Sequence, residues 1–266
     1  MPFTLSHAAA TLPIKWRLGS RADFPALAIG SMAPDFPYFL GLPLPRGATH
    51  SLIGALWFAL PMGLLAWLLW RGLLRLPIRM LAPAAIGRRI PLRPPSAPSF
   101  LILASSICLG ALTHVLWDAF THGSGFGVEE LPILGQALAD LPSYEVHDFH
   151  LLQHGSTLLG ALALVIATRR WIAITPVSVT SDGVSSWRRR GARLAFAFLP
   201  PLIGLAYAFS TTPLVASLFY IRLFVGRGAV AAMSACLLTL TFLGILERLG
   251  AFRSSLTPQA FDPSDV

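Results

Sequence analysis

Five long apolar runs dominate the pattern of hydrophobic and polar positions along this chain. They occupy residues 51–70, 99–117, 151–168, 194–221 and 228–246. A helix needs about 20 apolar residues to cross a bilayer, so each run is long enough, or nearly so, to span one. The first two contain no formal charge, and the second continues through Asp118 to about Phe120. The pattern predicts an all-α, polytopic transmembrane helix bundle of five spans.

The fourth run is longer than one span requires and contains Pro200, Pro201 and Pro213. Proline is tolerated in membrane helices and often bends them. The run is therefore either one kinked span or a kinked span followed by a second, short or tilted one. Six spans is the alternative count.

The first 50 residues do not contain a clear span. The stretch 24–40 is apolar, but Pro25, Pro34, Asp35 and Pro37 interrupt it. We expect this stretch to be interfacial or half-buried, preceded by a short helix near residues 6–12. Together they would form a short helical segment at the outer surface of the bundle.

Composition supports an integral membrane protein. Of 266 residues, 55% are hydrophobic and 12% are charged, whereas soluble domains carry about 25% charged residues. The net charge of +8 does not indicate nucleic acid binding, because the cations are almost all arginines between the apolar runs. Membrane lipids are the expected partners.

The distribution of these arginines predicts the orientation. Two connections are rich in arginine: Arg71, Arg75, Arg79, Arg88, Arg89 and Arg93, then Arg169, Arg170, Arg188, Arg189, Arg190 and Arg193. Residues 121–149 contain no Lys or Arg but five acids. By the positive-inside rule the arginine-rich connections are cytoplasmic and the acidic segment lies outside. We expect loops at 77–98 and 175–190.

The chain is expected to divide into four parts. Residues 1–168 would form a metal-site half, and 169–193 an arginine-rich cytoplasmic loop. Residues 194–252 would form the C-terminal transmembrane helices, and 253–266 a disordered tail.

All seven histidines lie within the first 154 residues, at the ends of apolar runs or in the N-terminal segment. Ionisable groups near a bilayer need a partner, a metal or a function. His114 and Asp118 are four residues apart, so they share one helical face about 6 Å apart. His122 follows one turn later if the helix continues. Imidazole with carboxylate suits Zn²⁺, Mn²⁺ or Fe²⁺; the alternative is a polar helix–helix contact.

The remaining candidates are weaker by themselves. His150 and His154 repeat the four-residue spacing, although a solvated helix start with Asp148 as its cap explains them equally well. Asp35 after Pro34 can be a turn former. His50 could simply precede the first span, and His7 alone indicates little.

The order of these residues resembles the zinc-dependent phospholipase C and S1/P1 nuclease superfamily. Its members bind three zinc ions through an early His, an Asp, a His, a helical His-x-x-x-Asp pair, another His and a His-x-x-x-Glu pair. The segments PFTLSH (residues 2–7), GSMAPD (30–35) and QHGS (153–156) further resemble a bacterial membrane family labelled domain of unknown function 4184. A related group of inner-membrane proteins is described as metal-dependent hydrolases.

The resemblance implies a set of metal ligands. Carried over residue by residue, one ion would be bound by Asp35, His50, His114 and Asp118. A second would be bound by His122, His150 and His154 with Asp35 bridging, and His7 would join Asp118 at a third. The final Glu of the pattern is His154 here, unless Glu145 or Asp148 replaces it. We therefore expect one to three divalent ions, with Zn²⁺ as the first choice.

The sequence supports one expected function and one alternative. The expectation is a zinc-dependent hydrolase of a phosphoester, a phospholipid or a lipid-linked phosphate, at the outer leaflet of the bacterial inner membrane. Asp35 and Asp118 would be its catalytic carboxylates, with Arg46 helping to bind phosphate. The alternative is a non-catalytic membrane protein, a transporter or an assembly factor, with structural or metal-binding histidines.

Overall fold

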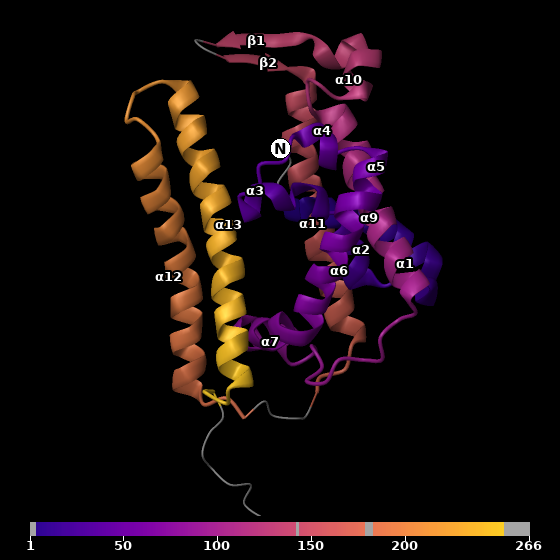
Figure 1. The fold of residues 1–266 in the computed structure, drawn as a ribbon, viewed down its shortest axis with the longest axis vertical. Coiled ribbons are helices and arrows are strands. Elements are labelled where there is room, and N and C mark those ends of the chain that lie inside the picture. Colours follow the sequence, from indigo (N-terminus) through magenta and orange to yellow (C-terminus); the bar gives the residue numbers. More distant parts are fainter. Residues whose placement is uncertain (1–3, 142–143, 179–182, 253–266) are drawn as a thin grey trace, which may run out of the picture.

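Five long apolar helices build the molecule. The computed structural model describes residues 4–141, 144–178 and 183–252. Within these ranges, five helices are long and apolar enough to cross a membrane. They are Leu52–Leu81, α9 (Phe100–Thr121), α11 (Asp148–Ile174), α12 (Ser186–Thr211) and α13 (Leu218–Arg248). The predicted all-α bundle of five spans is confirmed, and the chain is a multi-pass membrane protein (Figure 1).

The first spanning helix is continuous but irregular. It consists of α5 (Leu52–Gly54), η4 (Ala55–Ala59), α6 (Leu60–Leu69), η5 (Trp70–Leu74) and α7 (Arg75–Leu81), of which η4 and η5 are π-helical. The expected loop at 77–98 therefore starts later, and α8 (Ala84–Gly87) lies inside it. The helix continues because buried Arg75 and Arg79 donate hydrogen bonds to the carbonyl groups of Pro91, Leu92 and Ile90.

Two other predicted boundaries were wrong. The run 194–221 is neither one kinked span nor two, because α12 ends at Thr211 and the last residues belong to α13. Proline has no N–H to donate, so Pro213 lies in the connection between the two helices. The arginine-rich stretch 169–193 is also largely helical, since α11 continues to Ile174 and α12 starts at Ser186. Arginine is a good helix former, which explains the extension. The expected disordered tail lies outside the described residues.

The N-terminal segment is a chain of short helices. They are η1 (Thr4–Thr11), α1 (Leu12–Leu18), η2 (Gly19–Arg21), α2 (Phe24–Gly30), η3 (Ala33–Asp35), α3 (Phe36–Leu40) and α4 (Arg46–Thr49). Proline occupies the first turn of α1, α2, η3 and α3. A proline fits the first turn of a helix but not its interior, so the repeated prolines divide this stretch into pieces.

This segment reaches farther into the bundle than an outer-surface location implies. Helix α2 packs against the middle of α9, where Gly30 and Gly110 allow the two backbones to touch. A Cβ at Gly110 would lie 2.2 Å from the carbonyl oxygen of Leu27. Around this crossing lies a buried core of Ala26, Trp67, Leu103 and Ile107. The N-terminal segment is therefore packed alongside the spanning helices (Figure 1).

The acidic segment 121–149 folds at one end of the molecule. It contains α10 (Phe126–Glu130), η6 (Pro132–Gly135) and an antiparallel hairpin of β1 (Ala137–Leu141) and β2 (Tyr144–His147). The chain segments that follow α8 and α11 lie at the opposite end (Figure 1). The acidic and arginine-rich connections are thus separated by the length of the spanning helices.

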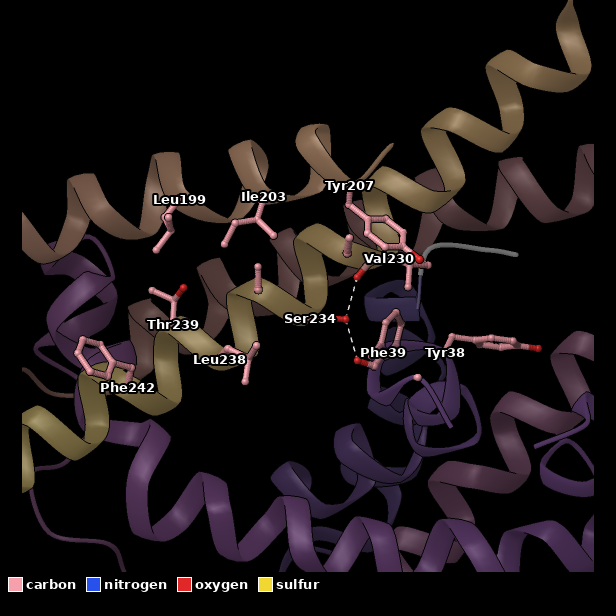
Figure 2. Close-up of a pocket in the computed structure, with 13 residues that line it drawn as sticks. Tyr38, Phe39, Leu199, Ile203, Tyr207, Val230, Ser234, Leu238, Thr239 and Phe242 are labelled. Atoms are coloured by element: carbon pink, nitrogen blue, oxygen red, sulfur yellow. Dashed lines mark hydrogen bonds between the residues drawn. The ribbon is translucent and has the colours of Figure 1, made fainter. Parts of the chain in front are cut away.

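Helices α12 and α13 form a pair through small residues, with Gly204 against Gly228 and Ala232. The pair meets the rest of the chain at two levels. Ser234 Oγ donates to the carbonyl oxygen of Phe39 on α3 at 2.7 Å, and Gly244 lies against Leu73. A groove of about 530 Å³ runs along α12 and α13 and reaches α3 (Figure 2).

Candidate metal centre

Separate short elements and one spanning helix bring five ionisable side chains together. Helix α9 supplies His114 and Asp118, and the other three come from η1, η3 and the junction of α4 with α5: His7, Asp35 and His50. Each of the five side chains is 3% exposed or less. Their ligand atoms form two groups, each within 4.8 Å, that share His114. We call these five residues the His/Asp cluster.

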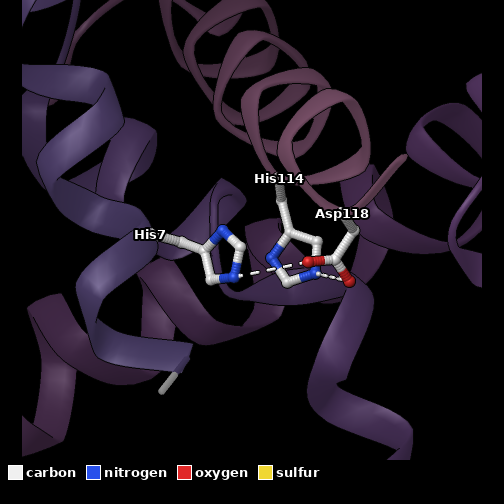
Figure 3. Close-up of side chains that lie close together, drawn as sticks. All are labelled: His7, His114 and Asp118. Atoms are coloured by element: carbon white, nitrogen blue, oxygen red, sulfur yellow. Dashed lines mark ion pairs between the residues drawn. The ribbon is translucent and has the colours of Figure 1, made fainter. Parts of the chain in front are cut away.

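The first group contains His7, His114 and Asp118 (Figure 3). His114 Nε2 lies 3.4 Å from Asp118 Oδ2, as expected from their spacing of one helical turn. The His7 ring stacks on the His114 ring with centroids 3.9 Å apart. His7 Nε2 also lies 3.7 Å from Asp118 Oδ1. His7, which is more than 100 positions earlier in the chain, therefore joins the predicted pair of His114 and Asp118.

The second group contains Asp35, His50 and His114. His50 Nε2 lies 3.2 Å from Asp35 Oδ1 and 3.6 Å from Asp118 Oδ2. Its other nitrogen, Nδ1, is 3.0 Å from Thr49 Oγ1, whose own hydrogen goes to the Arg46 carbonyl oxygen. Either nitrogen of His50 can therefore carry the hydrogen: Thr49 can accept from Nδ1–H, or Nε2–H can donate to Asp35 Oδ1.

The tautomer of His114 follows from its surroundings. Its Nδ1 lies 2.7 Å from the backbone oxygen of Ser31. A carbonyl oxygen only accepts, so Nδ1 carries the hydrogen and Nε2 presents a lone pair. That Nε2 faces Asp118 and, at 3.7 Å, Asp35 Oδ1, and has no hydrogen-bond partner. A lone pair facing two carboxylates requires a cation between them, either a proton or a metal ion.

Asp35 is fully buried and remains ionised. Burial by itself would raise its pKa, but the hydrogen bonds from His50 and Thr4 and the nearby His114 bring the pKa below its ordinary value. Thr4 Oγ1 donates to Asp35 Oδ2 at 2.7 Å. Sequence reasoning missed Thr4, although it stands three residues before His7. That is one turn of a 3₁₀ helix, which places both side chains on one face.

The two oxygens of Asp118 have different environments. Oδ2 accepts a hydrogen bond of 2.6 Å from Arg46 Nη2, and Oδ1 has no hydrogen-bond partner. The Arg46 side chain is 30% exposed, so Arg46 connects the buried carboxylate to the surface. This pairing was not expected from the sequence. It orients Asp118 and leaves one oxygen available to another cation.

The charges of the cluster do not balance when the imidazoles are neutral. The cluster contains two buried carboxylates, and the guanidinium of Arg46 pairs with one of them, Asp118, and compensates its charge. His7 does not supply the second positive charge, because burial and the neighbouring His114 lower its pKa to about 3. An uncompensated buried charge is costly. The three orphaned atoms His7 Nε2, His114 Nε2 and Asp118 Oδ1 belong to the residues of the first group, and their chemistry fits a divalent metal ion.

His122 lies at the rim of this arrangement. It follows α9 directly, and its Nδ1 is 3.6 Å from Asp118 Oδ1. Its Nε2 has no hydrogen-bond partner, and burial lowers its pKa to about 4. His122 is therefore neutral near pH 7 and close enough to Asp118 to approach a cation bound there.

His150 and His154 do not join the cluster. His150 Nδ1 accepts a hydrogen bond from the His147 backbone, which caps the start of α11, and His154 is exposed. The face of α11 that packs on η1 contains buried Gln153 and, four residues later, Thr157. His154 is one residue after Gln153, about 100° around the helix, so its side chain points away from that face. Among the described residues, neither histidine belongs to a group of three close ligands.

The structure therefore does not bring together the ligands that the superfamily resemblance implies for a second ion, namely His122, His150 and His154 with Asp35. The two residues that could replace the final Glu of the superfamily pattern, Glu145 and Asp148, also lie outside the His/Asp cluster. Glu145 is 3.5 Å from His147 Nε2, and Asp148 starts α11. Within the part of the chain that the structure describes, the groups of three close ligands all belong to the His/Asp cluster.

Comparison with known proteins identifies the family. The profile of the family described as Domain of unknown function (DUF4184) matches residues 1–245. The chain belongs to this family. No curated protein and no solved structure matches it at a significant level. The DUF4184 match contains every residue of the cluster, whereas the likeness to the phospholipase C superfamily rests on residue order alone.

The cluster of this DUF4184 member lies within the length of a spanning helix. Asp118 and His114 precede the end of α9 at Thr121 by about 5 and 10 Å along the helix axis. Buried imidazoles and carboxylates at such a depth can hold a divalent cation close to a membrane–water interface.

Proposed function

We propose that this DUF4184 protein is a membrane-embedded, zinc-dependent phosphoester hydrolase. One observation carries the proposal: three ligand-type atoms on His7, His114 and Asp118 are buried together without hydrogen-bond partners. Native proteins rarely leave such atoms unsatisfied unless they serve a function or an ion. His50 and Asp35 complete the ligand set from the other side of His114.

The chemistry follows from this ligand set. A divalent cation held by His7, His114 and Asp118 would lower the pKa of a bound water and stabilise negative charge on a phosphoryl oxygen. Asp35 stays ionised and orients the attacking water by accepting its hydrogen bond. The water oxygen forms a bond to phosphorus, the bond from phosphorus to the leaving oxygen breaks, and that oxygen takes up one proton of the water. Arg46, at the exposed edge, binds a non-bridging phosphoryl oxygen.

The geometry favours one ion per chain. His114 belongs to both ligand groups but has a single lone pair to offer, because its Nδ1–H donates to Ser31. Both groups therefore converge on the same cation. This count is lower than the three ions that the superfamily resemblance implies.

The position of the cluster indicates where the substrate would be found. The cluster is near the end of α9 that leads into the acidic segment 121–149. By the positive-inside rule that end faces the outer side of the bacterial inner membrane. A phosphoester attached to a membrane lipid would reach this depth directly.

Metal analysis of the purified full chain tests the proposal. We expect about one zinc per chain in the wild type and almost none in His114→Ala or Asp118→Asn. His154→Ala and Asp148→Asn are the matched controls, because these residues lie outside the cluster and should retain the metal. Circular dichroism checks that helicity is kept. Unchanged metal content in the two cluster variants would disprove the proposal.

Hydrolysis of the soluble diester bis(p-nitrophenyl) phosphate then separates an enzyme from a non-catalytic metal protein. Turnover that stops with a chelator and returns with Zn²⁺ is the expected result. Bound metal without turnover of soluble or lipid phosphoesters would favour the transporter or assembly-factor alternative. A wild type without metal would mean that a protonated imidazole bridges the carboxylates.

A further inference from the structure

The groove along α12 and α13 is an apolar channel that ends next to the His/Asp cluster. Leu199, Ile203 and Leu238 line its length, and Tyr38 and Phe39 of α3 close one end (Figure 2). Its α13 side extends from Val230 to Phe242, or about 18 Å at the rise of an α-helix. One of its polar groups, Ser234 Oγ, is already used in the bond to the Phe39 carbonyl.

Tyr38 joins this groove to the cluster. Tyr38 is one of the residues that line the groove, and its ring lies 6.3 Å from the ring of His50. Burial raises the pKa of Tyr38, with Arg46 acting in the opposite direction, so the phenol remains a hydrogen-bond donor at neutral pH. The hydroxyl points away from the groove (Figure 2). One residue therefore borders both the apolar channel and the polar centre.

The dimensions of the groove indicate what kind of molecule can bind in it. A volume of about 530 Å³ over about 18 Å corresponds to a cross-section of about 30 Å². A helix with its side chains is about 10 Å wide, so a helix from a second copy would lie over the groove and not inside it. One extended hydrocarbon chain fits inside it. Such a chain would also cover side chains that are otherwise exposed, among them Leu238 at 70% and Phe242 at 59%.

The residues at the Tyr38 end of the groove indicate which chemical group the bound molecule carries there. The Arg46 guanidinium, which pairs with Asp118, lies beside Tyr38 at the closed end of the groove. An anionic head placed there would meet a guanidinium and a phenol O–H, both suited to phosphate oxygens. At the far end Phe242 and Leu199 are apolar, and Thr239 is an uncharged polar residue beside them (Figure 2).

We infer that the groove binds the single hydrocarbon chain of a lipid phosphoester whose phosphate lies between Tyr38, Arg46 and the His/Asp cluster. This inference rests on the proposed function and specifies its substrate class. The substrate is a one-chain amphiphile that enters sideways from the bilayer. Its phosphate is presented to the cluster while its chain lies along α13.

Binding of radiolabelled 1-oleoyl-lysophosphatidate to the full chain in detergent tests the inference. Ala231→Trp fills the groove, and we expect it to weaken binding by about tenfold or more, because an overfilled site cannot accommodate the chain. Ala206→Trp places the same side chain on an exposed position of α12 outside the groove lining. That variant should bind the lipid as the wild type does. Circular dichroism confirms that each variant keeps its helical fold.

A photoreactive lipid gives a second measurement that needs no substitution. With a diazirine at the methyl end of the oleoyl chain, we expect labelling of the α13 segment that contains Leu238 and Phe242. Equal labelling of α11, whose Leu158 is 73% exposed, would overturn the inference. So would a lipid affinity unchanged in Ala231→Trp.

The outcomes separate this inference from the proposed function. Lipid binding that Ala231→Trp abolishes, in a protein without metal, would support the groove and end the hydrolase proposal. Metal binding with turnover of the soluble diester, but no lipid bound in the groove, would end the groove inference alone. A self-associated wild type that blocks lipid access would show that a second copy covers the groove, and would overturn the inference.

Discussion

Nδ1 of His114 lies 2.7 Å from the backbone oxygen of Ser31, a residue 83 positions earlier in the chain. This contact determines which nitrogen of His114 faces the carboxylates. It exists because α2 and α9 approach closely at Gly30 and Gly110, so that the end of α2 reaches the ring. The orientation of His114 in the cluster therefore depends on a glycine contact between two helices.

Replacing Gly110 with alanine should disturb this contact. The new Cβ would lie 2.2 Å from the Leu27 carbonyl oxygen, and overpacking of this kind typically costs about 1–3 kcal/mol. We expect a lower melting temperature and reduced zinc content. Gly155→Ala on α11 is the matched control, because its Cβ would meet nothing within 4 Å. Equal stability of the two variants would show that the backbones do not touch.

The metal-stripped protein should lose stability on acidification. The pKa of His7 is lowered by burial to about 3 from 6.5, so between these values the unfolded chain binds more protons than the folded one. Stability therefore falls as the pH decreases, by about 2 kcal/mol from His7 at pH 5. Asp35, whose pKa is also low, adds to the loss below pH 3.8. Melting temperatures between pH 7 and pH 4 measure the effect.

A variant isolates the contribution of His7. His7→Gln should flatten the dependence of melting temperature on pH, and His154→Gln, on an exposed residue, should not. An identical pH dependence of the melting temperature in the wild type and in His7→Gln would show that burial does not lower the pKa of His7 in the fold.

Arg46→Gln should separate substrate binding from metal binding. Asp118 Oδ1 has no hydrogen-bond partner and remains available to the ion when the guanidinium on Oδ2 is removed. We expect zinc to be retained and kcat/KM for the phosphodiester to fall by about 10–100-fold. Arg21→Gln, on an exposed residue of the same segment, should have no effect. Loss of zinc together with activity would instead assign Arg46 to the support of Asp118.

Cysteine labelling tests the proposed orientation. In a background where Cys108 and Cys236 are replaced by alanine, Ala139→Cys on β1 should react with a membrane-impermeant maleimide added to intact spheroplasts. Arg93→Cys should react only after the membrane is opened, because the arginine-rich connections are expected to be cytoplasmic. The reverse pattern would place the cluster near the cytoplasm and require a cytoplasmic substrate.

Local patterns explain why some of these features could be predicted. Span recognition needs only hydropathy summed over about 20 residues, and that property does not depend on neighbours in space. The proximity of His114 and Asp118 follows from helical periodicity in the same way. Errors occurred at helix ends, as at Arg75 and Arg79, where side-chain contacts with a later segment lengthen the helix.

The wider cluster could not be derived from local pattern. His7, Asp35 and His50 were candidates through residue order in other proteins, and their meeting depends on how α2 and η1 pack on α9. The same packing excludes His150 and His154, although their spacing equals that of His114 and Asp118. Spacing shows which residues share a face, but only packing decides where that face points.

By itself, the sequence determined an integral membrane protein of five spans with a His-x-x-x-Asp pair near the end of the second. Those features depend on interactions between residues close in the chain. Only the tertiary structure decided that Thr4, Arg46 and Ser31 orient the ligands, that three ligand atoms are left without partners, and that an apolar groove ends beside them. Contacts between distant segments follow from the packing of complementary surfaces, which no local pattern encodes.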